Sequence, residues 1–188
     1  MRTYKLTIAY DGTGYQGWQR QANTGNTIQG ILERCISEEA GYAVEVDGSG
    51  RTDAGVHAEG QTASVVLPGL AGDDFFLERV NGLLPPDIRI LEAELVRNGF
   101  HARKSAKGKV YEYHIDTGEK PDVFSRRYCC HYPRELDLSA MRRAAEYLTG
   151  THEFAGFTDK KEEKSTKRTI YPIIVTAQGR RATIRYEG

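Results

Sequence analysis

The order of strand-like and helix-like segments in the first half of the chain restricts its fold more than any other feature. Apolar and polar residues alternate in the first segment, where Leu6 and Ile8 share one side, as in a strand with one buried face. The same patterns predict strands at 4–10, 43–47, 61–67 and 88–95, and helices that begin near residues 26 and 73. The resulting order, β-α-β-β-α-β, is that of the ferredoxin-like unit, which RNA-recognition modules also use.

Both predicted helices have start and stop signals. Asn26 followed by Gln29 is a capping-box pattern, which predicts Asn26 as the N-cap of the first helix, and Gly41 is expected to end it. Asp73 is expected to cap the second helix, and Pro85 comes directly after it. The expected inward-facing residues are Ile28, Ile31, Leu32, Cys35 and Ile36 in the first helix, and Phe76, Val80 and Leu83 or Leu84 in the second.

The rest of the chain predicts a second α/β unit. We expect a crossover at 98–107, a helix at 139–148, and strands at 109–116, 126–131, 168–177 and 181–187. The expected fold class is therefore α+β, with two ferredoxin-like (RRM-like) units whose antiparallel sheets flank a central cleft. The expected domains are 1–105 and 106–188. The second is expected to be incomplete at its C-terminus, because Ala182, Ile184 and Tyr186 form one strand face that nothing later can cover.

The segment 48–61, between two predicted strands, is the best candidate for a functional site. It contains four glycines and is longer than a hairpin connection requires. It places a cation, a carboxylate and an imidazole close together, at Arg51, Asp53 and His57. In an extended segment Arg51 and Asp53 point the same way, so the arginine is expected to orient the carboxylate and keep it ionised. An isolated Arg-x-Asp would more often be an ordinary surface pair.

Charge and cysteine content narrow the possible partners. The net charge is zero, but no acidic residue occurs in 96–110 or 164–186, and both segments are rich in lysine and arginine. Such segregation is compatible with a basic face for phosphates, and equally with two solvated loops.

The three cysteines have no Cys-x-x-Cys spacing, which favours free thiols in a reducing cytoplasm over disulfides or a zinc site. No apolar run approaches the roughly 20 residues of a membrane span.

Residues 50–58 form the run Gly-Arg-Thr-Asp-Ala-Gly-Val-His-Ala. As an indicator of function, the whole run is far more specific than an isolated Arg-x-Asp. It resembles the signature of the tRNA pseudouridine synthase A (TruA) family, in which the aspartate is the catalytic nucleophile. The resemblance implies Asp53 as the nucleophile, Arg51 as the neighbouring catalytic cation and His57 as a substrate-binding residue. The glycine-rich segment 11–21 resembles a family segment that helps shape the catalytic cleft. Its aromatic residues Tyr15 and Trp18 could either pack the loop or offer stacking surfaces to RNA bases.

Further strings extend this resemblance over essentially the whole chain. Phe-His-Ala-Arg, which ends at Arg103, implies a substrate-binding arginine, and Tyr111 in Tyr-x-Tyr implies a ring that stacks on the target base. The family implies a homodimer that acts on the anticodon stem-loop of tRNA, at tRNA positions 38–40, without cofactor or metal. It also implies a following helix with a further arginine that contacts the catalytic aspartate and has no counterpart here.

The chemistry leaves two questions open. Asp53 could form a covalent adduct with the sugar or remove the C2′ proton to give a glycal. Two other classes compete with an isomerase. A non-catalytic RNA-binding module would need exposed sheet aromatics, yet no ribonucleoprotein string of the Gly-Phe-Gly-Phe kind occurs. A glycoside hydrolase would need paired carboxylates, for which Glu59 is the candidate partner of Asp53.

Overall fold

A computed structural model describes residues 1–68, 74–158 and 165–188. The chain divides into two compact units, Met1–Ala106 and Lys107–Gly188. Each contains a β-sheet with helices, so the expected α+β class is confirmed. Within the described residues, no helix is long and apolar enough to cross a membrane.

The first unit is built on a four-stranded antiparallel sheet with the order β2-β3-β1-β4. Its strands are β1 (Arg2–Tyr10), β2 (Val46–Gly48), β3 (Ala58–Leu67) and β4 (Ile88–Val96). The central strand β1 lies between β3 and β4, and Leu6 is opposite Ala63 on one side and Ala93 on the other. Four strands were predicted here. The structure confirms them with shifted ends, most clearly in β3, which begins three residues early.

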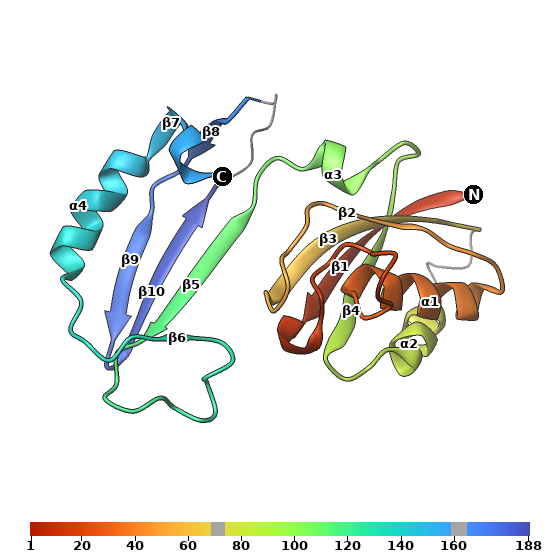
Figure 1. The fold of residues 1–188 in the computed structure, drawn as a ribbon. Coiled ribbons are helices and arrows are strands. Elements are labelled where there is room, and N and C mark those ends of the chain that lie inside the picture. Colours follow the sequence, from red (N-terminus) through yellow and green to blue (C-terminus); the bar gives the residue numbers. More distant parts are fainter. Residues whose placement is uncertain (69–73, 159–164) are drawn as a thin grey trace. The chain divides into compact units, whose positions relative to one another are not determined.

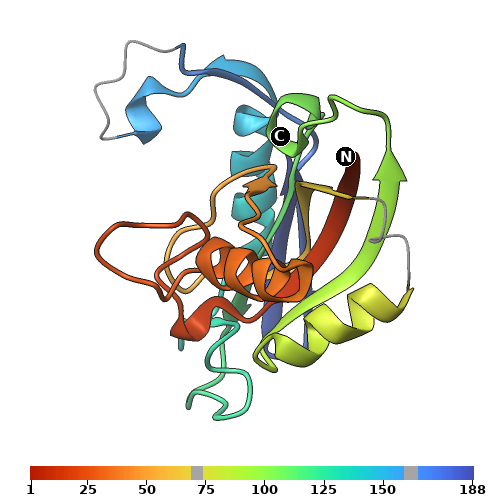
Figure 2. The same ribbon diagram turned by 90° about the vertical axis from the view of Figure 1, so that its right-hand side faces the viewer.

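Helices α1 (Ile28–Ala40) and α2 (Asp74–Leu83) lie side by side on one face of this sheet (Figure 1), as the turned view also shows (Figure 2). The predicted stripe of α1 is buried, and Gly41 ends the helix in a left-handed conformation with φ 77°. The predicted N-cap is wrong by one residue: Thr27 accepts the Gly30 N–H, while the Asn26 side chain donates to the carbonyl of Gly14. The cap predicted at Asp73 lies outside the described residues.

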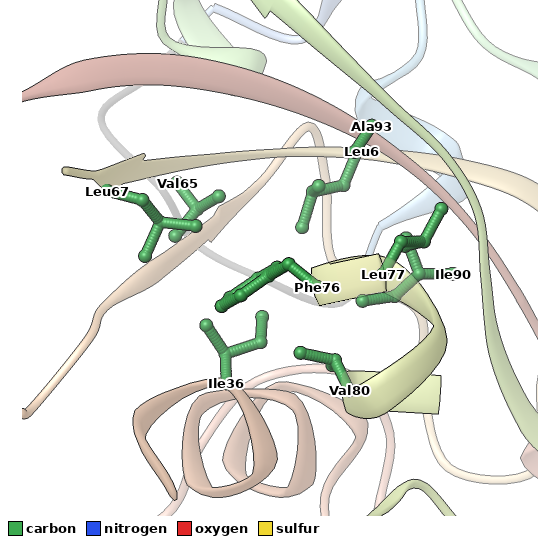
Figure 3. A pocket seen from close by; sticks show the side chains of 9 residues that line it. All are labelled: Leu6, Ile36, Val65, Leu67, Phe76, Leu77, Val80, Ile90 and Ala93. Atoms are coloured by element: carbon green, nitrogen blue, oxygen red, sulfur yellow. The ribbon is translucent and has the colours of Figure 1, made fainter. Parts of the chain in front are cut away.

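A small apolar cavity lies between the sheet and the two helices. Figure 3 shows Ile36 of α1 and Phe76 and Val80 of α2 directed toward strand residues such as Leu6 and Val65. The nine lining residues, all apolar, are Leu6, Ile36, Val65, Leu67, Phe76, Leu77, Val80, Ile90 and Ala93. With no polar side chain in its lining, the cavity is a packing feature of the core and offers no chemistry.

The second unit has a mixed sheet with the order β6-β5-β10-β9 and a separate β7–β8 pair (Figure 1). Its elements are β5 (Val110–Asp116), β6 (Cys130–His131), α4 (Leu138–Leu148), β7 (Gly150–Glu153), β8 (Lys167–Ile170), β9 (Ile174–Gln178) and β10 (Arg181–Glu187). Helix α4 packs on β9, where the Arg142 guanidinium donates to the Val175 carbonyl at 3.1 and 3.2 Å. The prediction of a purely antiparallel sheet is wrong here, because β5 and β6 are parallel.

Two further strand predictions in this unit need correction. The segment 168–177 forms two strands rather than one, with Pro172 in the gap between β8 and β9. Proline has no N–H to donate to a sheet, which explains the break. The predicted strand 126–131 is reduced to Cys130–His131, and the residues before it form turns.

A buried carboxylate anchors one end of the second sheet. Asp116, at the end of β5, accepts bonds of 2.6 and 2.8 Å from the Arg180 guanidinium, and it also accepts the N–H groups of Gly118 and Asp122. The hydrogen bonds from Arg180 are the main reason that the pKa of Asp116 lies far below its usual value. The pair fixes the turn after β5 against the β9–β10 hairpin.

Candidate active site

The candidate residues of the motif lie on a loop between two neighbouring strands, and we call residues 49–57 the motif loop. Its base is held by β3: the Ser49 N–H donates to the Thr62 carbonyl at 2.8 Å, and the Gln61 amide donates to the Gly50 carbonyl at 2.6 Å. The Ser49 hydroxyl also donates to Gln61 at 3.1 Å. The loop therefore leaves the sheet in a fixed direction.

A second loop, residues 11–21, packs against the motif loop, and we call it the supporting loop. The Trp18 N–H donates to the Thr52 carbonyl at 3.0 Å, and the Gly55 N–H donates to the Tyr15 carbonyl at 3.4 Å. At the end of β1, the Tyr10 hydroxyl is 2.9 Å from the Thr52 hydroxyl. These contacts hold the backbone on both sides of Asp53.

Two glycines make the close contact between the loops possible. Gly17 has φ +87°, and a Cβ placed there would be 2.7 Å from the Thr52 oxygen and 3.1 Å from the Asp53 carbonyl carbon. A Cβ at Gly12 would overlap the carbonyl oxygen of Val56. Since contacts this short are not tolerated between non-bonded atoms, the two backbones approach each other only where side chains are absent.

The supporting loop is in turn fixed to the first turn of α1. The carbonyls of Gly17 and Trp18 accept the N–H groups of Ile28 and Gln29 at 3.1 and 3.0 Å. The first N–H groups of a helix have no acceptor within the helix, and here carbonyls of the supporting loop accept two of them. The motif loop is therefore connected through the supporting loop to a helix of the core.

Tyr15 and Trp18 pack the supporting loop and are not open stacking surfaces. Trp18 is only 1% exposed and lies against the backbone of Gly48, and Tyr10 and Trp18 have ring centroids 6.0 Å apart. The Tyr15 hydroxyl donates to Asp87 at 2.5 Å, and burial together with this bond raises the pKa of Tyr15. Of the two readings open from the sequence, packing is the one that the structure supports.

Asp53 is exposed at the tip of the motif loop. Its carbonyl accepts the Val56 N–H at 3.2 Å, which closes a turn with Gly55 at the position where φ is +79°. Turns with a positive φ at their third residue favour glycine. Within the described residues, the Asp53 carboxylate makes no hydrogen bond and no ion pair, so it is accessible to a substrate.

Arg51 is held by a series of amides rather than by Asp53. Its Nε donates to Gln19 at 3.0 Å, Gln19 donates to Gln29 at 2.8 Å, and Gln29 donates to the Val46 carbonyl at 2.9 Å. The expected ion pair between Arg51 and Asp53 is not present in the described part of the chain. The arginine is nevertheless exposed and lies two residues from the carboxylate.

His57 joins the two loops. Its Nδ1 lies 3.1 Å from the Gly12 nitrogen, which donates to it, and 3.0 Å from a carboxylate oxygen of Asp11. An unprotonated Nδ1 suits the Gly12 N–H, whereas a protonated one suits Asp11. Asp11 itself also accepts the Thr13 N–H and hydroxyl, which fixes the start of the supporting loop. His57 is thus partly buried at the contact between the loops.

The other two predicted site residues lie outside the loop pair. Arg103 is exposed on the short helix α3 (Ala102–Ser105) of the first unit, which is attached to β3 by the Ala102 N–H and the Ser64 hydroxyl at 3.0 Å. Tyr111 belongs to the second unit, on β5, and is 43% exposed. Its ring stacks on Tyr186 of β10 with centroids 5.1 Å apart. The structure therefore groups Arg51, Asp53 and His57 in one loop.

Sequence reasoning missed the residues that hold this loop. The sequence patterns place Tyr10 in a strand, Gln19 in a loop and Gln29 in a capping box, and none of them indicates a contact with the motif loop. The available signal was the density of polar side chains in 16–21, next to a helix that begins with a glutamine in its first turn. As for metals, the described residues contain no group of three or more His, Cys, Asp or Glu side chains that could hold an ion.

Comparison with known proteins gives a consistent result. A family model described as tRNA pseudouridine synthase matches residues 6–103, which include both loops and the first two residues of α3. The chain is 40% identical over 189 residues to tRNA pseudouridine synthase A 2 of Bacillus cereus (strain ZK / E33L), with 100% of this chain and 77% of that protein covered. It is 45% identical over 177 residues to tRNA pseudouridine synthase A of Lacticaseibacillus casei (strain BL23), with 93% and 71% covered. The chain belongs to the tRNA pseudouridine synthase A family.

Proposed function

We propose that this chain converts uridine to pseudouridine in tRNA, with Asp53 as the nucleophile. The observation that supports this most directly is an exposed aspartate at the tip of a loop that two neighbouring segments hold rigidly, in a chain of this family. A carboxylate that must meet one atom of a sugar gains from such fixed geometry, because a correctly placed group removes much of the entropic barrier.

The reaction requires no reagent besides the substrate and water. The bond between C1′ and N1 breaks, the uracil turns, and a bond forms between C5 and C1′ while the C5 proton passes to water. Asp53 either attacks C1′ to form a covalent adduct or removes the C2′ proton to give a glycal. A base within a stem must first leave the stack, so the site also needs groups that hold the extruded nucleotide.

The remaining roles follow from charge and exposure. We assign Arg51 and Arg103, both exposed cations of the first unit, to substrate phosphates, with Arg51 close enough in sequence to act beside Asp53. His57 is assigned to substrate binding at the junction of the loops. Tyr111 is assigned to stacking on the target base, since aromatic rings supply sequence-tolerant contacts to extruded bases.

Several broader features belong to the same proposal. The order β2-β3-β1-β4 with two helices on one face supports a ferredoxin-like first unit. We propose the second unit as a variant of it, with domains at 1–105 and 106–188. The family resemblance is the basis for proposing a homodimer, the anticodon stem-loop as target and the cytoplasm as location.

The test is Asp53→Asn, assayed with tRNA that carries tritium at uracil C5. Asparagine keeps the size of the side chain and cannot act as nucleophile or base, so tritium release should stop while tRNA binding persists. Glu59→Gln, an exposed carboxylate at the start of β3, is the matched control and should keep full activity. Tritium release by Asp53→Asn free of unaltered enzyme would refute the assignment. Loss of activity in Glu59→Gln would instead favour a pair of carboxylates, as in glycosidases.

A further inference from the structure

We propose that Tyr10 and Gly17 are positioning residues that fix the backbone from which the Asp53 side chain projects. The effect on the reaction rests on the proposed function above, but the effect on the loop does not. Neither residue belongs to the motif, and neither is placed to touch the substrate. They meet two different groups of Thr52, the residue directly before Asp53: Tyr10 meets its hydroxyl and Gly17 its carbonyl.

The need for positioning follows from the surroundings of Asp53. In the part of the chain that the structure describes, no side chain bonds its carboxylate, so only the backbone of residues 52–55 determines where its Cβ points. A side chain on a mobile backbone would sample many directions, and a displacement of about 1 Å can cost about 100-fold in rate. Whatever fixes this backbone therefore contributes to catalysis.

Tyr10 fixes it through a buried hydroxyl. The residue is 4% exposed, ends the central strand β1, and is paired with Ala58 of β3 and Ile88 of β4. Its hydroxyl lies 2.9 Å from the Thr52 hydroxyl. Burial raises the pKa of Tyr10, so the hydroxyl stays protonated at neutral pH and the bond is always available. The central strand β1 is thus joined to the residue before the proposed nucleophile.

Gly17 fixes the same backbone by contact. Its Cα lies so close to Thr52 and Asp53 that an added Cβ would be 2.7 Å from the Thr52 oxygen, 3.1 Å from the Asp53 carbonyl carbon and 3.2 Å from the Ala54 nitrogen. All three neighbours are backbone atoms, which cannot turn away as the end of a side chain can. The carbonyl of Gly17 is bonded to the first turn of α1, so the surface behind Asp53 is itself fixed.

The hydroxyl bond can be removed from either side. Tyr10→Phe and Thr52→Val each delete one hydroxyl with little change in shape, and Thr52→Ser keeps it. Tyr4→Phe is the matched control, because Tyr4 is as buried as Tyr10, lies on the same face of β1 opposite Val65, and makes no side-chain hydrogen bond to the motif loop in the described structure. We expect Tyr10→Phe and Thr52→Val to lower the single-turnover rate about tenfold, to leave the Kd for tRNA unchanged, and to be non-additive when combined.

The contact is tested by Gly17→Ala against Gly14→Ala. A Cβ at Gly14, in the same loop, meets no atom within 4 Å and has no unfavourable φ. Gly17→Ala should lower the single-turnover rate about 100-fold. Gly14→Ala should keep the rate of the unaltered protein.

Amide hydrogen exchange measured by NMR gives a readout that does not need turnover. Tyr10→Phe, Thr52→Val and Gly17→Ala should exchange faster at the Gly55 and Val56 amides, with the amides of α1 beyond its first turn unaffected, and the three control variants should match the unaltered chain. Equal exchange in all variants would overturn the proposal, as would a normal rate in a variant whose loop is loosened. If the unaltered chain releases no tritium, the proposed function fails. The amide-exchange comparison then tests by itself whether Tyr10 and Gly17 hold the backbone around Asp53.

Discussion

The packing of Trp18 on Gly48 makes a prediction whose size can be worked out from the structure. In Gly48→Ala, the new Cβ would lie 2.5 Å from both Cε2 and Nε1 of the indole ring, about 1 Å inside a normal contact. Trp18 is 1% exposed, so the ring can withdraw only by displacing the atoms packed around it. Overpacking of this kind costs about 1–3 kcal/mol, and we expect a loss of about 2 kcal/mol in the free energy of unfolding.

The assay is urea unfolding followed by tryptophan fluorescence. Trp18 is the single tryptophan of the chain, so its emission reports on the first unit alone. Gly60→Ala is the matched control: it too adds one methyl group to a strand of the same sheet, but its Cβ would meet Thr7 at an ordinary 3.7 Å. We expect Gly60→Ala to change the stability by no more than about 0.5 kcal/mol.

The reasoning would be refuted by a Gly48→Ala protein with the unfolding midpoint and the emission maximum of the unaltered chain. That result would mean that the indole does not lie on Gly48. Equal losses in Gly48→Ala and Gly60→Ala would mean that any added methyl group harms this sheet, whatever its contacts.

Three further predictions concern other parts of the molecule. Tyr111→Phe should keep base stacking, whereas Tyr111→Ala should lose about 1–3 kcal/mol of interaction with the target base. Single-turnover kinetics measure this loss as a lower rate for Tyr111→Ala, and equal rates for the two variants would contradict the stacking role. Gln19→Met removes the amide that holds Arg51 and should weaken the Kd for tRNA about fivefold in filter binding, so an unchanged Kd would count against that contact. Arg180→Gln should destabilise the second unit near neutral pH, as measured by urea unfolding. Because the pKa of Asp116 is lowered in the folded state, this difference is fully present above the unfolded pKa of about 3.9 and should shrink as the pH falls below about 4. A difference that stays constant into strong acid would contradict the ion pair.

Local patterns were sufficient for most of the secondary structure. Strand β1 has the period-two alternation of a half-buried strand, and α1 has both a clear stripe and a glycine at its end, so each was found within a few residues. Asn26 and Thr27 are adjacent, and both residue types favour the N-cap position of a helix. Thr27 is the N-cap because the Asn26 side chain instead bonds the Gly14 carbonyl, a contact that no local pattern reveals. The break at Pro172 has a local signal, the proline itself, but it lies in a run rich in β-branched residues that favours one continuous strand.

The site was predictable only in part, for a physical reason. The motif loop was recognised because its own residues are unusual. Its supports were not, since the Tyr10–Thr52 contact joins residues 42 positions apart and the Gln19–Arg51 contact joins residues 32 apart. Contacts of this length depend on how strands pair and loops fold back, which periodicity and capping rules do not determine.

The close approach of Gly12 and Gly17 to the motif loop has a consequence for protein engineering. Residues 48–61 cannot be moved to another protein by themselves, because residues 10–19 help to hold them in shape. Two of those contacts require glycine, at Gly12 and Gly17. A graft of the motif loop onto another antiparallel sheet would need both segments and the first turn of the helix that holds the supporting loop. Diversification libraries should likewise keep both glycines constant and vary the two loops jointly rather than one at a time.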